Sequence, residues 1–471
     1  MKKLTTKTKA LYGLGFAAQG IKDGLFQLFL FFYFSQILGL DAALTGISTL
    51  IALAFDAISD PIIGVISDNW KSKKWGRRHP FMFASALPFG LFIWLLFLPP
   101  TDLSQMGLFW WMTIFTILVR LSMTLFLIPG MSLGAELTED FEERNSVTSY
   151  RVSFAAIAPP LVITFGLLTF FTPTIENANG LFNKAAYPKF ALLCGILIVF
   201  LVLISTWGTR DTIPHLPKSS DNSQRLSFAQ FISGVSQAFQ LTSFKTLIAY
   251  TMWVYIGIGV GTVFTTYYTT YFFGLSEREL AAMPIGTFLG GLFALFLTPY
   301  LGKKLDKKPT IIWSTILFGF FFSLPFNLRL LNWFPENNTP LLLPLYILAT
   351  MVAYLFIFVA FSISSSMMAD VVDEYELHSG DRQEGLFFAA LSFAYKCTVG
   401  LGYVIAGVIL NYIAFPKQVA VEEVPAEVIR SLGIVGGPLT LFIYCFGVFF
   451  ILYYPISKAR YLEIRNALDK V

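Results

Sequence analysis

The sequence predicts an all-α membrane protein with twelve transmembrane helices in two six-helix halves. Hydrophobic residues make up 55% of the 471 residues and charged residues only 13%, with a mean hydropathy of +0.66. A soluble chain of this length needs a larger polar share to cover its surface. Apolar stretches of about 20 residues, the length that crosses a bilayer, recur along the chain, and one long polar segment divides them six and six.

The apolar stretches set the expected spans. The first stretch is too long for a signal peptide and lacks a small-residue cleavage site, so we expect it to be an uncleaved insertion signal. The predicted spans are 10–38, 44–67, 80–98, 107–133, 146–172, 188–208, 246–273, 281–301, 309–331, 341–367, 385–413 and 433–456.

The Lys and Arg residues predict the orientation of these spans. With both termini inside, 23 of the 33 Lys and Arg residues lie in cytoplasmic segments, five in outside loops and five within spans. Short cytoplasmic loops are enriched in positive charge. We therefore expect a multi-pass protein of the plasma membrane, in a bacterium the inner membrane, with both termini in the cytoplasm and the lipid bilayer as a partner.

The polar segment between the sixth and seventh spans marks the domain boundary. We expect an N-terminal six-helix bundle at residues 1–208, a cytoplasmic central loop at 209–245 and a C-terminal six-helix bundle at 246–471. Basic loops follow the second and eighth spans, and acidic loops follow the fourth and tenth. Repeated halves are typical of transporters that rock around a central site, although the basic loops alone would also fit ordinary membrane topology.

Two carboxylates in the second span are the strongest functional signal. Asp56 and Asp60 are four residues apart and so share one helix face. Two bare carboxylates repel each other in a low dielectric, so we expect either a bound cation or a proton there. Oxygen-rich sites suit hard metal cations such as Na⁺. The hydroxyls of Ser59 and Thr124 would add ligands to a cation site of Asp56, Asp60 and Thr124.

A purely structural ion pair with Lys22 or Arg120 is the alternative for these acids. Ionisable groups inside a span are costly and usually functional. Lys22 and Asp23 are adjacent, about 100° apart on the helix, and are not expected simply to face each other. Asp23 would bind substrate hydroxyls and Lys22 would balance the acids of the second span, unless the two form an internal pair that fixes packing.

Three more cations lie within spans. Arg120 can pair with a carboxylate of the second span or bind an anionic substrate group in bidentate fashion. Arg151 and Lys396 lie deep enough to line a cavity, where they would contact substrate or form part of a gate.

Charged residues at the cytoplasmic ends of the spans are candidates for an inner gate. Arg77 and Arg144 belong to the first half, and Asp370 and Asp373 to the second. Ion pairs among them would close the gate and break when it opens. The alternative is a solvated loop face.

Other classes of function find little support in the sequence. The three Cys residues lie in apolar stretches and are interpreted as packing residues, not a disulfide framework. The three His residues are far apart, without metal-ligand spacing or a nucleophile motif, so an enzyme is not expected. Intramembrane carboxylates and the lack of an appended soluble domain count against a receptor or structural protein. No cofactor and no nucleic-acid partner are expected.

Several motifs together give the chain a family resemblance. From about Tyr12 to Pro455 the sequence resembles the glycoside–pentoside–hexuronide:cation symporters, the melibiose-permease branch of the major facilitator superfamily. The motifs that carry the resemblance are Gly20 to Asp23, Asp56 to Pro61, Arg144 with Ser149 to Arg151, and Ala369 to Asp373 followed by Glu384, Gly385 and Lys396.

The resemblance implies the major facilitator fold and symport of a small solute with Na⁺, Li⁺ or H⁺ by a monomeric carrier. It implies a cation site at Asp56, Asp60 and Thr124, with Ser59 where an asparagine can stand. It also implies sugar contacts at Asp23 and Arg151, with Lys396 near both sites.

The chain departs from melibiose permeases on its fourth span. Leu127 and Met131 stand where those proteins have an acidic residue and a tryptophan that hold the galactosyl ring. Arg120 is an additional cation, which an acidic or sulfonated sugar would use. We therefore expect a glycoside or uronide-type sugar. A sodium-coupled lysophospholipid carrier is the alternative, because an apolar face suits a lipid tail.

Overall fold

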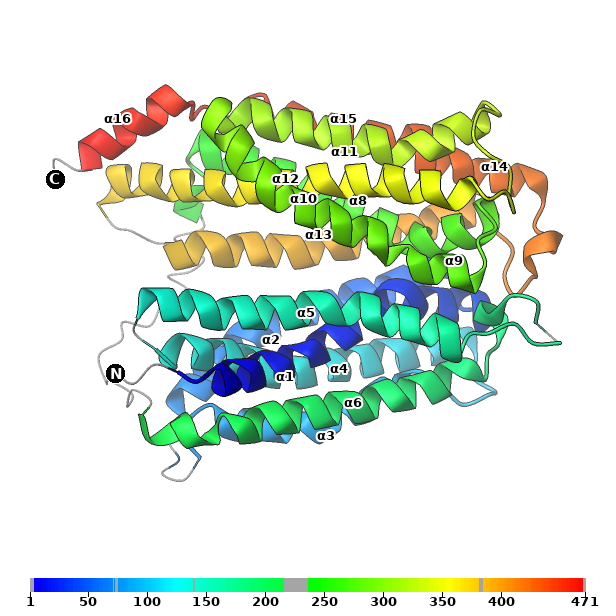
Figure 1. Ribbon diagram of the computed structural model, residues 1–471, viewed down its shortest axis with the longest axis horizontal. Coiled ribbons are helices and arrows are strands. Elements are labelled where there is room, and N and C mark those ends of the chain that lie inside the picture. The colour runs from blue at the N-terminus through cyan, green and yellow to red at the C-terminus, as the bar shows by residue number, and fades with distance from the viewer. Residues whose placement is uncertain are drawn as a thin grey trace.

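The computed structural model is a bundle of long helices with both termini at the same end (Figure 1). It describes residues 4–70, 72, 75–138, 140–175, 177–215, 236–380 and 384–468. Most of the predicted central loop, residues 216–235, lies outside the described residues. Helices of the first half gather on one side of the bundle and helices of the second half on the other.

The first half is built from six long helices. Helix α1 packs against α5 and α6, α3 packs against α4 and α6, and α2 packs against α4. The elements are α1 (Thr6–Gly24), η1 (Leu25–Leu30), η2 (Tyr33–Ile37), α2 (Ala42–Asn69), α3 (His79–Leu96), α4 (Gln105–Glu136), α5 (Phe141–Thr169), η3 (Gly180–Phe182), α6 (Ala186–Gly208) and η4 (Arg210–His215).

The second half repeats this plan with more interruptions. Helix α12 packs against α10 and α11, and α8 packs against α13 and α15. The elements are α8 (Thr242–Tyr267), η5 (Tyr268–Phe272), α9 (Glu277–Ala282), α10 (Pro284–Lys304), α11 (Lys307–Leu330), α12 (Leu342–Ser379), α13 (Glu384–Tyr412), η6 (Val421–Glu423), α14 (Ala426–Ile434), η7 (Val435–Leu439), α15 (Thr440–Ile451) and α16 (Lys458–Leu468).

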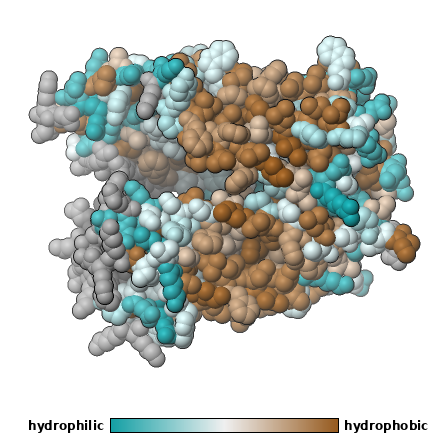
Figure 2. Space-filling view, in the orientation of Figure 1, coloured by the Kyte–Doolittle hydropathy of each residue, from teal (hydrophilic) through white to brown (hydrophobic). Residues whose placement is uncertain are grey.

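The predicted membrane spans are largely confirmed. Among the described residues, eleven helices are long and apolar enough to cross a bilayer, so the chain is an integral multi-pass membrane protein. The predicted span 10–38 supplies the twelfth as α1, but the π-helical turns η1 and η2 interrupt it. Figure 2 shows an apolar band across the middle of the visible face, with polar residues towards both ends, as expected of lipid-facing helices.

The prediction of an acidic loop after the tenth span was wrong in part. Helix α12 continues to Ser379, so Asp370 and Asp373 lie on the helix itself. After Pro344 in the first turn, neither proline nor glycine occurs in α12 before Gly380, which adopts φ 76° and ends the helix in the left-handed conformation. The polar residues beyond the apolar span keep the helical path because they extend out of the expected bilayer region.

The two halves meet mainly where α2 packs along α13. Helix α5 also contacts α9, and α8 contacts η1. In the space-filling view the surface is hollowed between the halves at the end that carries the termini (Figure 2). The bundle is therefore closed at the end opposite the termini and more open at the end that carries them.

Candidate binding site at the centre of the bundle

The two acids of the second span lie together in the middle of the bundle, as predicted. Asp56 and Asp60 project from the same face of α2 towards α4, because they are one helical turn apart. Thr124 of α4 lies between them, with its Oγ1 3.2 Å from Asp56 Oδ1 and 2.8 Å from Asp60 Oδ1. Three of the predicted cation ligands thus share one site.

Two cations already lie against these acids. Arg120 Nη1 is 3.3 Å from Asp56 Oδ2, and Lys396 Nζ is 3.0 Å from the same oxygen. Lys396 also forms an ion pair with Asp60 Oδ2. Since Lys396 belongs to α13 and the acids belong to α2, this cluster joins the two halves at the centre of the molecule.

The two carboxylates differ in their access to solvent. The side chain of Asp56 is 3% exposed and that of Asp60 is 22% exposed. Asp56 is thus enclosed by its cationic partners, whereas Asp60 borders open space. A small ion that approaches this site would meet Asp60 first.

Ser59 does not join the cluster. Its Oγ donates a hydrogen bond to the backbone oxygen of Asp56, at 3.2 Å. Ser59 and Asp60 are neighbours and point about 100° apart on the helix, and no hydrogen bond between Ser59 and either carboxylate is found among the described residues. The ligand role predicted for Ser59 therefore stays a prediction.

Lys22 and Asp23 form an ion pair with each other, which is the alternative that the sequence left open beside a substrate role for Asp23. The long flexible lysine side chain bridges the angle between the two positions. Lys22 is buried, with its Nζ 5.3 Å from the centre of the Phe26 ring, and Arg120 Cζ lies 5.8 Å from the same ring. Asp23 remains 44% exposed, so its second oxygen can still accept a hydroxyl.

The other predicted substrate residue, Arg151, lies apart from the acids. Its Cζ is 5.7 Å from the centre of the Phe16 ring, so α5 presents the guanidinium towards α1. Leu127 is partly buried and Met131 is exposed. The face of α4 below Thr124 is apolar, as the sequence indicated.

The predicted gate residues are paired inside their own halves. Arg77 Nη2 is 2.8 Å from Glu136 Oε1, and Arg144 Nη2 donates to the Thr138 carbonyl at 3.4 Å.

In the second half, Lys307 Nζ is 2.7 Å from Asp370 Oδ2, and Arg465 Nη1 is 3.6 Å from Asp373 Oδ2. A gate formed by bridges between the halves therefore stays a prediction for another conformation.

Sequence reasoning missed a polar cluster at the end opposite the termini. Asp41 bonds Asn411 and Lys417 there, across the boundary between the halves. The available signal was the position of Asp41 directly before an apolar helical stretch, which is typical of a helix N-cap.

Comparisons with known proteins agree with this architecture. The sequence matches the family described as MFS/sugar transport protein over residues 11–458. An uncharacterised symporter of Synechocystis sp. is 26% identical, over 99% of this chain and 97% of its own length. A putative glycoside/cation symporter of Escherichia coli is 26% identical, over 100% of this chain and 96% of its own.

The fold is shared with solved transporters. The xylose transporter XylE from E. coli matches with a TM-score of 0.61 at 12% identity, over 98% of both chains. This confirms the predicted major facilitator fold, and the family match excludes the enzyme class, as expected. The chain therefore belongs to the family of MFS/sugar transport proteins.

Proposed function

We propose that this protein is a secondary active transporter that carries a small glycoside or uronide-type sugar together with Na⁺ or H⁺ by alternating access. The observation that carries the proposal is the cluster of Asp56, Asp60, Thr124 and Lys396, which joins the halves at the centre and borders open space at Asp60. A relative of the same family is named as a putative glycoside/cation symporter.

The lysine of this cluster explains how ion binding can be linked to movement. Its ammonium lies against both acids, where a coupling cation would be held by Asp56, Asp60 and Thr124. Carboxylate and hydroxyl oxygens suit a hard cation. A cation that enters must displace Lys396, and because Lys396 belongs to the other half, the exchange alters a contact between the halves. The ion thereby shifts the balance between their arrangements.

The charges within the spans favour an acidic substrate. Of the five cations within the spans, Arg329 bonds Pro335 and Asn337 near the end of α11. The other four, Lys22, Arg120, Arg151 and Lys396, are set against three carboxylates, Asp23, Asp56 and Asp60. An uncompensated charge is costly in a low dielectric, and a bound coupling cation would add one more positive charge.

Arg120 also has a buried Nε without a hydrogen-bond partner among the described residues. A sugar carboxylate would offset the excess positive charge and would accept a hydrogen bond from Arg120 Nε. Asp23 would accept hydrogen bonds from the sugar hydroxyls.

The remaining parts of the proposal concern location and assembly. The Lys and Arg distribution supports the inner membrane of a bacterium with both termini in the cytoplasm. We propose a monomeric carrier whose partners are the solute, the coupling cation and the bilayer, with no cofactor and no nucleic acid.

The test is uptake into proteoliposomes under an imposed Na⁺ or H⁺ gradient, with a panel of neutral sugars, uronides and lysophospholipids. We expect gradient-driven accumulation of a sugar, strongest for a uronide. Asp56→Asn should abolish accumulation but leave downhill movement, because the site then lacks one of its two charges. Asp211→Asn, at a highly exposed acid, is the matched control. Undiminished accumulation by Asp56→Asn would contradict the proposal.

A sodium-coupled lysophospholipid carrier is the second candidate. The apolar surface of Leu127 and Met131 on α4 favours it, since such a surface can pack against an acyl chain. The same panel separates the two candidates, because only one class of solute should be accumulated.

A further inference from the structure

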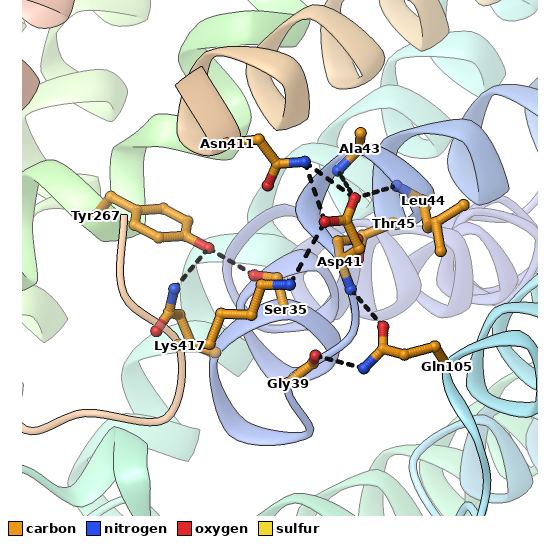
Figure 3. A network of polar contacts seen from close by, with 11 residues as sticks. Ser35, Gly39, Asp41, Ala43, Leu44, Thr45, Gln105, Tyr267, Asn411 and Lys417 are labelled. Atoms are coloured by element: carbon orange, nitrogen blue, oxygen red, sulfur yellow. Dashed lines mark hydrogen bonds and ion pairs between the residues drawn. The ribbon is translucent and has the colours of Figure 1, made fainter. Parts of the chain in front are cut away.

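Polar contacts between the two halves close the end of the bundle opposite the termini, and Asp41 lies at the centre of one group of them (Figure 3). Asp41 follows η2 and precedes α2. Its Oδ1 accepts hydrogen bonds from the backbone N–H of Ala43, at 2.9 Å, and of Leu44, at 3.2 Å. The carboxylate is therefore the N-cap of α2.

The same carboxylate also contacts residues of the second half. Asn411 Nδ2, at the end of α13, lies 3.0 Å from each carboxylate oxygen of Asp41. Lys417 Nζ, in the loop after α13, lies 3.4 Å from Oδ2. Hydrogen bonds to a charged acceptor are stronger than those between neutral groups, so these contacts tie the start of α2 to the end of α13.

The second half shows that capping alone does not require a carboxylate. Gly274, Leu275 and Ser276 repeat Gly39, Leu40 and Asp41: both glycines have positive φ, 58° and 75°, and both leucine amides bond a carbonyl of the preceding π turn at 2.8 Å.

Ser276 caps α9 with its hydroxyl. One oxygen is therefore enough to cap a helix. The second oxygen and the negative charge of Asp41 serve to bind Asn411 and Lys417.

The contacts continue inwards from Asp41. Ser35 Oγ lies 2.5 Å from Tyr267 OH, and Gln36 Nε2 lies 3.4 Å from the same hydroxyl. Both side chains of η2 are buried, whereas the side chain of Asp41 is 32% exposed. Asp41 is therefore the solvent-accessible part of this closure, where water can replace the bonds between the halves most readily.

We propose that Asp41 is a latch: its carboxylate holds Asn411 and Lys417 in the conformation described here and releases them when the end opposite the termini opens, while it continues to cap α2. This inference rests on alternating access as proposed above. It assigns a role in closing this end to a side chain for which no contact with the central acids or the expected substrate residues is found among the described residues.

The test removes the latch from either side. Asp41→Ser keeps a side-chain oxygen that can cap α2, as Ser276 caps α9 in the second half. It removes the charge that binds Asn411 and Lys417. Asn411→Ala combined with Lys417→Met leaves Asp41 and its cap intact. Asp102→Ser is the matched control, because Asp102 is an exposed acid between α3 and α4 at the same end, with a hydrogen bond from Thr101 of its own half.

The readout is the rate at which a membrane-impermeant thiol reagent labels Ser35→Cys in full-length protein in proteoliposomes, with Cys397 and Cys445 replaced by alanine. We expect a roughly five- to tenfold faster rate for both latch variants, as the net contribution of partly exposed hydrogen bonds predicts, and no change for Asp102→Ser.

An unchanged rate in both latch variants would overturn the proposal. A faster rate in Asp41→Ser alone would also overturn it, since the effect would then not depend on the contacts with Asn411 and Lys417. The labelling needs no solute or gradient, so failure of the latch and failure of the transport proposal are distinguishable. Monodispersity and helix content of each variant identify misfolding, and the double variant tests the latch even where Asp41→Ser misfolds.

Discussion

The two ends of the bundle use polar side chains differently. At the end that carries the termini, strong ion pairs lie inside one half: Arg78 with Glu136, at 2.8 Å, and Lys307 with Asp370, at 2.7 Å. At the opposite end, Asp41 bonds Asn411 across the boundary. Another contact across it joins Glu277 of α9 to the backbone N–H of Gly180.

This difference separates contacts that build each half from contacts that depend on the state of the carrier. A pair inside one half can persist while the halves rock, and so keeps each half rigid. A pair between the halves must break when that end opens. Lys396 with Asp60 lies between the two ends and also crosses the boundary, so the centre is the place where ion binding can influence both ends.

The largest effect is expected from disturbing the closed end at its backbone contact. A Cβ added to Gly407 of α13 would lie 2.2 Å from the carbonyl oxygen of Ala42, so Gly407→Ala should keep α2 and α13 apart. Overpacking costs about 1–3 kcal/mol, and about 1.4 kcal/mol is a tenfold change. We expect uptake to fall, and labelling of Ser35→Cys to rise, by about tenfold or more.

Gly261→Ala is the control for that substitution, because an added Cβ at Gly261 of α8 meets no atom within 4 Å. It should leave the rate of uptake and the rate of Ser35→Cys labelling within about twofold of the parent, as expected of a substitution that strains no contact. Equal effects at both glycines would show that helix stiffness, and not the close approach of α2 and α13, determines the outcome.

An intermediate effect, on stability alone, is expected at the end that carries the termini. Glu136 accepts hydrogen bonds from Arg77 and Arg78 within the first half. Glu136→Gln should lower the free energy of unfolding by about 1–3 kcal/mol, because charge-assisted hydrogen bonds of a buried arginine are lost. Thermal unfolding in detergent measures this loss.

The same variant should not change labelling of Ser35→Cys, because its contacts lie inside one half. Glu463→Gln, which removes an exposed pair with Arg460, should have almost no effect on stability. Faster labelling in Glu136→Gln would mean that pairs inside one half also control the closed end.

The smallest effect is expected from pH at the closed end. Burial by itself would raise the pKa of Asp41, but hydrogen bonds from Asn411 and the Leu44 amide, together with the charge of Lys417, hold this pKa below its usual value. The pKa of Asp41 is therefore lower in the closed conformation than in the open one. Its contribution to closure is fully present above the ordinary aspartate pKa of about 3.9. This contribution is lost as the pH falls through the lowered pKa.

Spin labels at residues 102 and 412, on opposite halves, can measure that loss. Lowering the pH from about 7 to below about 4 should raise the population with long distances between the two labels by roughly twofold. In Asp41→Ser the population should already be raised and should respond less to pH. An identical pH response in that variant would exclude Asp41 as the titrating group.

Much of the central site followed from local sequence. Asp56 and Asp60 had to share a face because of helical periodicity. The ligand role of Ser59 stays a prediction, since its hydroxyl bonds its own helix backbone in this conformation. For Lys22 and Asp23 the sequence left an internal pair open beside a substrate role, because periodicity does not determine how a long lysine side chain bends.

Asp41 could not be identified as a contact between the halves from the sequence. Its partners are 370 and 376 residues away in the chain, and nothing local distinguishes an acid that only caps a helix from one that also reaches across. The gate predicted for Arg77, Arg144, Asp370 and Asp373 stays a prediction, because the partners that these charges take depend on how the halves are placed.

The spans, the division into halves and the pair of intramembrane acids could be predicted from the sequence, because hydrophobic length and helical periodicity are local properties. Which charges meet depends on the tertiary structure. Lys396 comes to the acids of α2, and Asn411 to Asp41, because two bundles are packed against each other. That packing is a property of the whole chain in one of its states, and no local pattern encodes it.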